Sequence, residues 1–197
     1  AGDCYSSQLA CVEALRYQHL NPIKQIHASL ANRDCINILM VGQYDMASTK
    51  RALQILDECL QLPSLGNLTL NILFKAHPSS PVDLSEYAFS TISLWTGSLE
   101  SAAQASHLAI SPLQTAASLD LYLMGLPTVV IDDATCLNLC PLREFSSYRK
   151  AAIPAELADQ ILQIINSTSI DTSFTREEPY VFGSDLARWQ RLFDQQS

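Results

Sequence analysis

Polar residues that directly follow apolar runs are the part of this chain best suited to chemistry. His77-Pro78 follows the run Leu68–Phe74, and Thr115-Ala116-Ala117-Ser118 comes shortly after the run His107–Ile110. An imidazole can donate a hydrogen bond to an anion. Hydroxyl groups among small side chains let an anion approach the free N–H groups at the start of a helix. Phosphate is the anion that we expect at these loops.

Structural roles for the same residues remain open on this pattern alone. His77 could do no more than cap the end of its strand, and Thr115 could be a plain N-cap of the following helix. Gly125 is most simply a helix C-cap, and Pro127 a stop signal.

A third loop, Gly42-Gln43-Tyr44, follows the apolar run Ile36–Val41 and could approach a ligand closely. It lacks the three glycines of a dinucleotide-binding loop and the lysine of a P-loop, so both functions are disfavoured. The sequence also lacks a Gly-x-Ser-x-Gly elbow, the usual signal of an α/β-hydrolase. Asp132-Asp133 could hold magnesium or a ribose hydroxyl, but we expect it to form an Asx turn.

The elements that must position these loops are strands alternating with helices. Such alternation predicts an α/β fold with a Rossmann-like parallel sheet covered by helices on both faces. Ligands bind at the carboxyl edge of sheets of this kind. The expected strands are Ile36–Val41, Leu68–Phe74, Ser90–Trp95, His107–Ile110 and Thr128–Ile131. The expected helices between them follow Asp45 up to Pro63, span Leu99–Ala105, and run from the Thr115 loop to Gly125.

The remaining segments complete a single domain. Residues 1–34 are predicted to be a helical segment, broken at Asn21-Pro22, that leads into a Rossmann-like domain over residues 35–197. In that domain we expect a loop over 134–150, a helix over 154–166 and a last helix over 184–193.

Composition limits the class of partner. The 197 residues include 48% apolar and 16% charged residues, which is enough to bury a full core. The formal net charge of −8 argues against nucleic acid as a partner, because nucleic acid is held by clustered Lys and Arg. We expect a cytoplasmic protein, since no long apolar run or signal-like start is present. The six cysteines and four histidines are too scattered to predict a metal site.

Four motifs in order resemble the C-terminal, donor-binding half of GT-B glycosyltransferases. They are His77-Pro78, Thr115 to Ser118, Gly125-Leu126-Pro127 and Asn138-Leu139-Cys140-Pro141-Leu142-Arg143. The resemblance covers about residues 36–195 and is greatest to bacterial surface-carbohydrate biosynthesis proteins. The His-Pro and hydroxyl motifs are also similar to those of transferases that use CMP-activated sugars or CDP-glycerol.

The resemblance implies a role for each motif. His77, Thr115 and Ser118 would hold the phosphate of the departing nucleotide, without a metal or other cofactor. Pro78, Gly42, Gln43, Asn138 and Arg143 complete the expected substrate-binding set, although Cys140 and Glu144 depart from the family pattern. The donor would be a CMP- or CDP-linked sugar.

Size sets this chain apart from a whole GT-B enzyme, because only one Rossmann-like half fits its length. The resemblance therefore implies that a separate N-terminal half carries the acceptor site and the catalytic base, and that this chain alone is inactive. It also allows peripheral membrane association of the full-length protein. Two alternatives stay open: a non-catalytic Rossmann-like interaction domain, and half of a nucleotide-sugar epimerase.

Overall fold

The computed structural model of the chain describes residues 12, 14–17, 20, 30, 33–87, 92–145, 147–167 and 186–194. The chain divides into two compact units, one made of residues 1–20 and 174–197 and the other of residues 21–173. The larger unit contains the sheet and its helices, and the smaller unit contains the last helix.

The larger unit is built on a parallel sheet of six strands in the order β3-β2-β1-β4-β5-β6. The order reverses between β1 and β4, which is the switch point where doubly wound sheets leave a crevice for a ligand. The strands are β1 Ile36–Val41, β2 Leu70–Lys75, β3 Ile92–Leu94, β4 Leu108–Pro112, β5 Thr128–Ile131 and β6 Arg149–Ala151.

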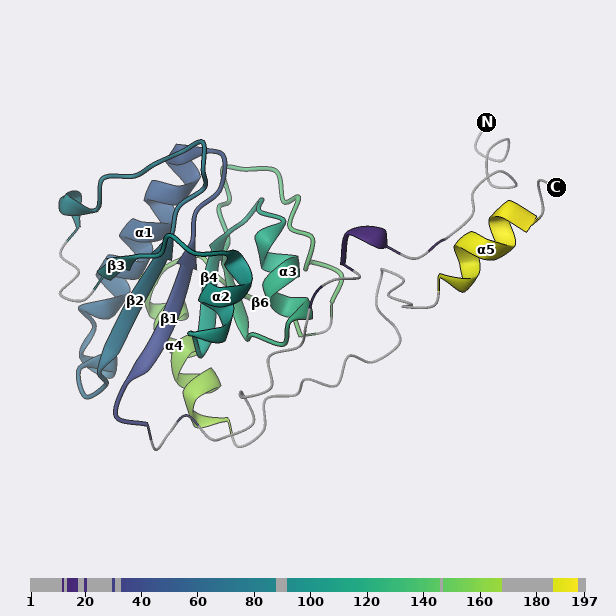
Figure 1. The fold of residues 1–197 in the computed structure, drawn as a ribbon. Helices are drawn as coiled ribbons and strands as arrows, with labels where there is room; N and C mark the ends of the chain where they lie inside the picture. The colour runs from purple at the N-terminus through teal and green to yellow at the C-terminus, as the bar shows by residue number, and fades with distance from the viewer. Residues whose placement is uncertain are drawn as a thin grey trace. The chain divides into compact units, whose positions relative to one another are not determined.

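Helices cover both faces of this sheet, with α1 and α4 on one face and α2 and α3 on the other (Figure 1). Because neighbouring residues of a strand point to opposite faces, Ile38 and Met40 join the buried cluster against α1 and α4. The intervening Leu39, also fully buried, belongs to the other face. The helices are α1 Met46–Leu60, α2 Leu99–Gln104, α3 Ala117–Leu123 and α4 Pro154–Asn166, with short 3-10 turns at Pro63–Leu65 and Leu84–Glu86.

The ends of α1 and α3 follow from local sequence. The carboxylate of Asp45 accepts a hydrogen bond from the Ser48 N–H at 2.9 Å and so caps α1. Gly125 ends α3 with φ at 84°, a conformation that glycine adopts without strain. Pro127 comes two residues later, just before β5.

The α/β fold class expected from the sequence is confirmed, and one element of the prediction is wrong. The expected loop over 134–150 ends in a sixth strand, β6, which pairs in parallel with β5. Its sequence, Arg149-Lys150-Ala151, is short and mostly polar, so no apolar run signals it. An edge strand with one neighbour can be polar because it is only partly covered.

The smaller unit is described over a 3-10 turn, Leu15–Tyr17, and the helix α5, Ala187–Asp194. The rings of Trp189 and Phe193, one helical turn apart on α5, stack with their centroids 6.0 Å apart. Most of the helical segment predicted over residues 1–34 lies outside the described residues. Within the described parts of the chain, none of the helices combines the length and apolarity needed to cross a membrane.

Candidate functional site

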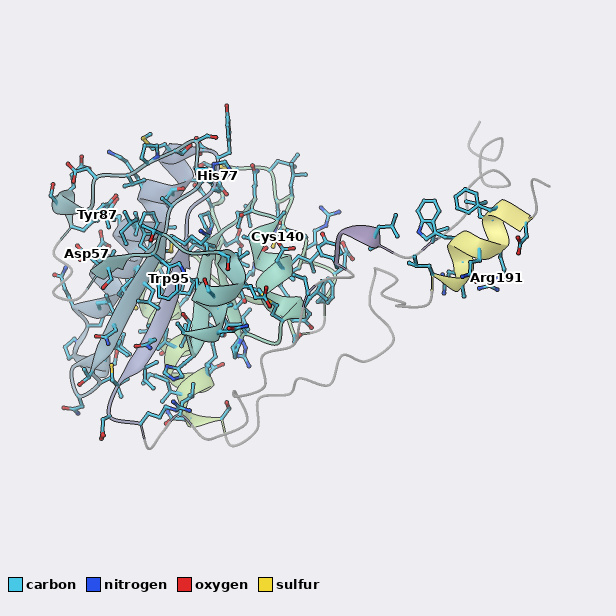
Figure 2. All side chains as sticks on the ribbon, viewed as in Figure 1. Asp57, His77, Tyr87, Trp95, Cys140 and Arg191 are labelled. Atoms are coloured by element: carbon cyan, nitrogen blue, oxygen red, sulfur yellow. The ribbon has the colours of Figure 1, made fainter. Side chains whose placement is uncertain are left out.

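Three predicted loops meet at the carboxyl edge of the sheet, after β1, β2 and β4. Parallel strands end at the same edge, and β1 lies between β2 and β4 in the sheet. His77, two residues beyond β2, lies at this edge (Figure 2). The loops after neighbouring strands are joined by specific contacts.

The loop after β2 is a tight turn that orients the His77 ring. The Ser80 N–H donates to the His77 carbonyl at 3.0 Å, with Pro78 at the second position of the turn. The Ser79 N–H donates to His77 Nδ1 at 3.2 Å, so Nδ1 carries a lone pair and the ring proton belongs on Nε2. The half-buried His77 therefore presents a hydrogen-bond donor at Nε2.

The loop after β1 packs directly against this turn. A Cβ atom on Gly42 would lie 3.1 Å from the His77 backbone nitrogen, so the two loops pack closely and a side chain here would crowd the turn. The Ser80 hydroxyl donates to the Tyr44 carbonyl. The Tyr44 ring meets the His77 ring edge-on, with centroids 5.8 Å apart.

Gln43 joins the loops after β1 and β4 across the switch point. Its side chain is buried, with 4% of the residue exposed. Its backbone N–H donates to Thr49 Oγ1 at 3.0 Å, and its Oε1 accepts the Gln114 N–H at 3.2 Å. The second contact assigns the amide, because only the oxygen can accept from an N–H.

The loop after β4 leads into α3 with its hydroxyls turned toward its own backbone. Thr115 Oγ1 accepts the Ala117 N–H at 3.3 Å, and the fully buried Ser118 donates its hydroxyl to the Thr115 carbonyl at 2.7 Å. In the part of the chain that the structure describes, the N–H groups of Thr115 and Ala116 donate no hydrogen bond. In this loop, the backbone N–H groups of Thr115 and Ala116 are therefore better placed than the Ser118 hydroxyl to contact a ligand.

Asn138 and Arg143 lie on the loop between β5 and β6 and are joined by a hydrogen bond. Arg143 Nη1 donates to the Asn138 carbonyl at 3.0 Å, and Arg143 Nε lies 3.0 Å from Glu144 Oε1. This loop is attached to the candidate site by Gln114, whose Nε2 donates to the Leu137 carbonyl at 2.6 Å. The substrate-binding role of Asn138 and Arg143 stays a prediction.

Two carboxylates at the same edge, those of Asp45 and Asp133, already accept hydrogen bonds from neighbouring residues. Hydrogen bonds from Ser48 hold the pKa of Asp45 below its usual value, so its carboxylate serves the start of α1. Hydrogen bonds from Thr135, with a smaller contribution from Arg51, lower the pKa of Asp133. Thr135 donates from N–H and hydroxyl to Asp133 Oδ1, which confirms the expected Asx turn.

A small pocket lies beside these groups, between α1 and the loops after β4 and β5. It has room for about one water molecule, and its lining includes Arg51, Gln114 and Asp133. Arg51 Nε and Asp133 Oδ2 are 3.4 Å apart. Among the described residues, no three His, Cys, Asp or Glu side chains are arranged to hold a metal ion.

The sequence interpretation missed Gln114, which contacts both Gln43 and the β5–β6 loop. Its signal was its position, since it comes two residues after the end of β4 in the same loop as Thr115. Its partners could not be identified, because Gln43 lies 71 residues away in sequence.

Comparison with known proteins gives a likeness in fold. No protein-family profile matches the sequence, and no curated protein matches it significantly. The structure is similar to UDP-GlcNAc 2-epimerase of Methanocaldococcus jannaschii, solved in complex with UDP-GlcNAc and UDP. The TM-score is 0.56 at 14% identity, over 87% of this chain and 49% of the epimerase chain. This chain thus spans about half the length of that structure.

A looser likeness is to the glycotransferase of kitacinnamycin, with a TM-score of 0.44 and 13% identity, over 80% of this chain and 40% of that one. At 14% identity the likeness to the epimerase concerns the fold alone, and it agrees with a Rossmann-like α/β fold for this chain.

Proposed function

We propose that this chain is the donor-binding half of an enzyme that acts on nucleotide sugars. The observation that carries the proposal is the joining of three loops at the β1–β4 switch point, where they present hydrogen-bond donors at one edge of the sheet. The likeness to half of an epimerase solved with UDP-GlcNAc and UDP supports the same class of ligand.

The donors suit a phosphate group. His77 Nε2 and the N–H groups of Thr115 and Ala116 belong to loops that flank β1 on its two sides. Fixed donors of this kind stabilise the charge that grows on the nucleotide phosphate as the bond to the sugar breaks. The chain has a net charge of −8, so its overall field does not attract an anionic ligand, and fixed donors close to the phosphate must hold it.

The finer assignment rests on the sequence resemblance. We infer a CMP- or CDP-linked sugar as donor and a cytoplasmic role in bacterial surface-polysaccharide synthesis, with transfer catalysed together with an N-terminal half. Large apolar side chains are exposed on the loops after β1 and β5 and at the first residue of α1, and they offer a surface for that half. They are Tyr44, Met46, Leu137 and Leu139.

Calorimetric titration with CMP, CDP and UDP tests the proposal. We expect a cytidine nucleotide to bind best and His77→Ala to weaken it about tenfold, as expected for a lost hydrogen bond to a charged group. Gln163→Ala, at an exposed position on α4, is the matched control and should leave affinity unchanged. If none of the three nucleotides binds, the chain is better explained as an interaction domain.

The epimerase likeness favours one second candidate, half of a nucleotide-sugar epimerase. Both candidates would bind a nucleotide sugar at this edge, so fold and binding do not separate them. The products do. Incubating the assembled enzyme with UDP-GlcNAc and following the sugar by NMR would show inversion of configuration at one ring carbon for an epimerase, and no epimer for a transferase.

A further inference from the structure

We propose that Gln43 is a specificity-determining residue whose side-chain amide donates a hydrogen bond to the phosphate of the ligand. This inference rests on the proposed function and assigns one contact within it. The two ends of the Gln43 amide, its oxygen and its nitrogen, differ in their hydrogen bonds.

One end of the amide is fixed by the protein. Gln43 Oε1 accepts the Gln114 N–H at 3.2 Å, and the backbone of Gln43 is held by Thr49. The amide therefore cannot exchange its oxygen and nitrogen without placing two donors against each other. The side chain also has little freedom to turn away, since only 4% of the residue is exposed.

The other end of the amide has no protein acceptor. Within the described residues, Gln43 Nε2 donates no hydrogen bond. In that part of the chain, the side-chain oxygens and nitrogens that are fully enclosed and have no hydrogen-bond partner belong to Ser111 and Tyr148. Gln43 Nε2 is not one of them, so it is partly accessible. A buried polar side chain is normally satisfied. Gln43 Nε2 is a fixed donor whose acceptor comes from outside the chain.

The position of this donor indicates the kind of acceptor. Gln43 follows β1, which lies between the strand that leads to His77 and the strand that leads to Thr115. The three loops together supply N–H donors, and the two nearby carboxylates, Asp45 and Asp133, are engaged elsewhere. An ionised phosphate, which offers acceptors only, fits this set better than a sugar hydroxyl, which also donates.

The decisive variant is Gln43→Glu. A glutamate can still accept the Gln114 N–H with one oxygen, but it presents a negatively charged acceptor where the amide presented a donor. At pH 7.5 we expect CDP to bind at least about thirtyfold more weakly, and cytidine, which has no phosphate, to bind as it does to the wild type. Lowering the pH to 5 should recover part of the CDP affinity as the carboxyl takes up a proton.

Gln163→Glu is the matched control, because it adds the same charge at an exposed position on α4. Its CDP affinity should stay within about twofold of the wild type, as expected for a screened surface charge. If Gln43→Glu fails to fold by circular dichroism, Gln43→Met removes the donor without adding charge. That variant should weaken CDP about tenfold, as expected for loss of a hydrogen bond to a charged group.

The outcomes separate this inference from the proposed function. If the wild type binds no nucleotide, the proposed function fails and the inference with it. If the wild type binds CDP and either folded variant of Gln43 binds it equally well, the inference is overturned and the proposed function stands. An equal loss of cytidine and CDP would also overturn it, because the contact would then not be to phosphate.

Discussion

Two histidines lie at opposite edges of the sheet and differ in what surrounds their rings. His77, at the carboxyl edge, accepts one hydrogen bond and keeps a donor at Nε2. His107 comes directly before β4, at the amino edge, where its Nδ1 accepts the Asn37 N–H at 2.8 Å and Arg33 Nη1 lies 2.9 Å from its Nε2. Burial, and then the charge of Arg33, lower the pKa of His107 below 6.5.

The environment of His107 makes the free energy of unfolding depend on pH. Because the folded pKa of His107 lies below its unfolded value, the unfolded chain binds a proton first as the pH falls. His107 therefore contributes fully above about pH 6.5, and its contribution decreases as the pH falls toward the folded pKa. We expect urea unfolding to show a larger loss between pH 7.5 and 5.5 for the wild type than for His107→Gln. An NMR titration of His107 at or above 6.5 would contradict this.

Single-residue features were predictable where the signal is local. Gly125 as a helix end and Asp133 in an Asx turn both follow from neighbours within two or three residues, and both are confirmed. The Gln43–Gln114 contact joins residues that only the folded sheet brings together. No spacing rule in the sequence connects them, and the burial of Ser118 was equally hidden from local pattern.

At the scale of elements, burial on one face of α1 changes the pKa of a cysteine side chain. Its buried face includes Ala52, Leu56 and Cys59, which repeat at helical spacing. Burial raises the pKa of the Cys59 thiol from 9.0 to about 12. Burial also raises the pKa of Cys140, on the β5–β6 loop. Cys35 and Cys136 are partly exposed.

The four thiols should therefore react at different rates. The thiolate is the reactive form, and a pKa of about 12 leaves very little of it on Cys59 near neutral pH. With iodoacetamide at pH 8, followed by peptide mass spectrometry, we expect Cys35 and Cys136 to be modified more than about a hundredfold faster than Cys59. In urea the difference should disappear. Equal rates in the folded protein would contradict the packing of α1.

The sequence predicted elements best where burial is two-sided. The first, second, fourth and fifth strands are apolar runs because helices cover both faces of the sheet, and they lie within two residues of their expected bounds. β6 was missed because an edge strand that carries Arg149 and Lys150 has no such run. The described part of the third strand, Ile92–Leu94, falls within its expected range.

At the scale of the whole molecule, the chain corresponds to about half of the epimerase structure that it resembles. A nucleotide bound at the carboxyl edge of one sheet would be covered on one side only. In the proposed enzyme the second half closes the other side and brings the catalytic base. Exposed apolar side chains lie at this edge, on the loops after β1 and β5 and at the start of α1; they are Tyr44, Met46, Leu137 and Leu139.

This division predicts that the isolated chain binds nucleotide weakly and transfers no sugar. Addition of the N-terminal half should tighten CMP or CDP binding and create turnover, because the base and the acceptor site would then be present. Calorimetry and a nucleotide-release assay measure the two effects. Measurable turnover by this chain alone would contradict the expectation, and would require a base among its own residues.

Of the two outermost strands of the sheet, β6 is three residues long, and β3 is described over Ile92–Leu94. A short edge offers an approaching chain few backbone groups with which to extend the ladder, and the positive charges of Arg149 and Lys150 on β6 make such an approach less favourable. The long apolar strands are all interior. The strand order therefore keeps the long apolar strands away from the edges of the sheet, which are the places where aggregation through a sheet would begin.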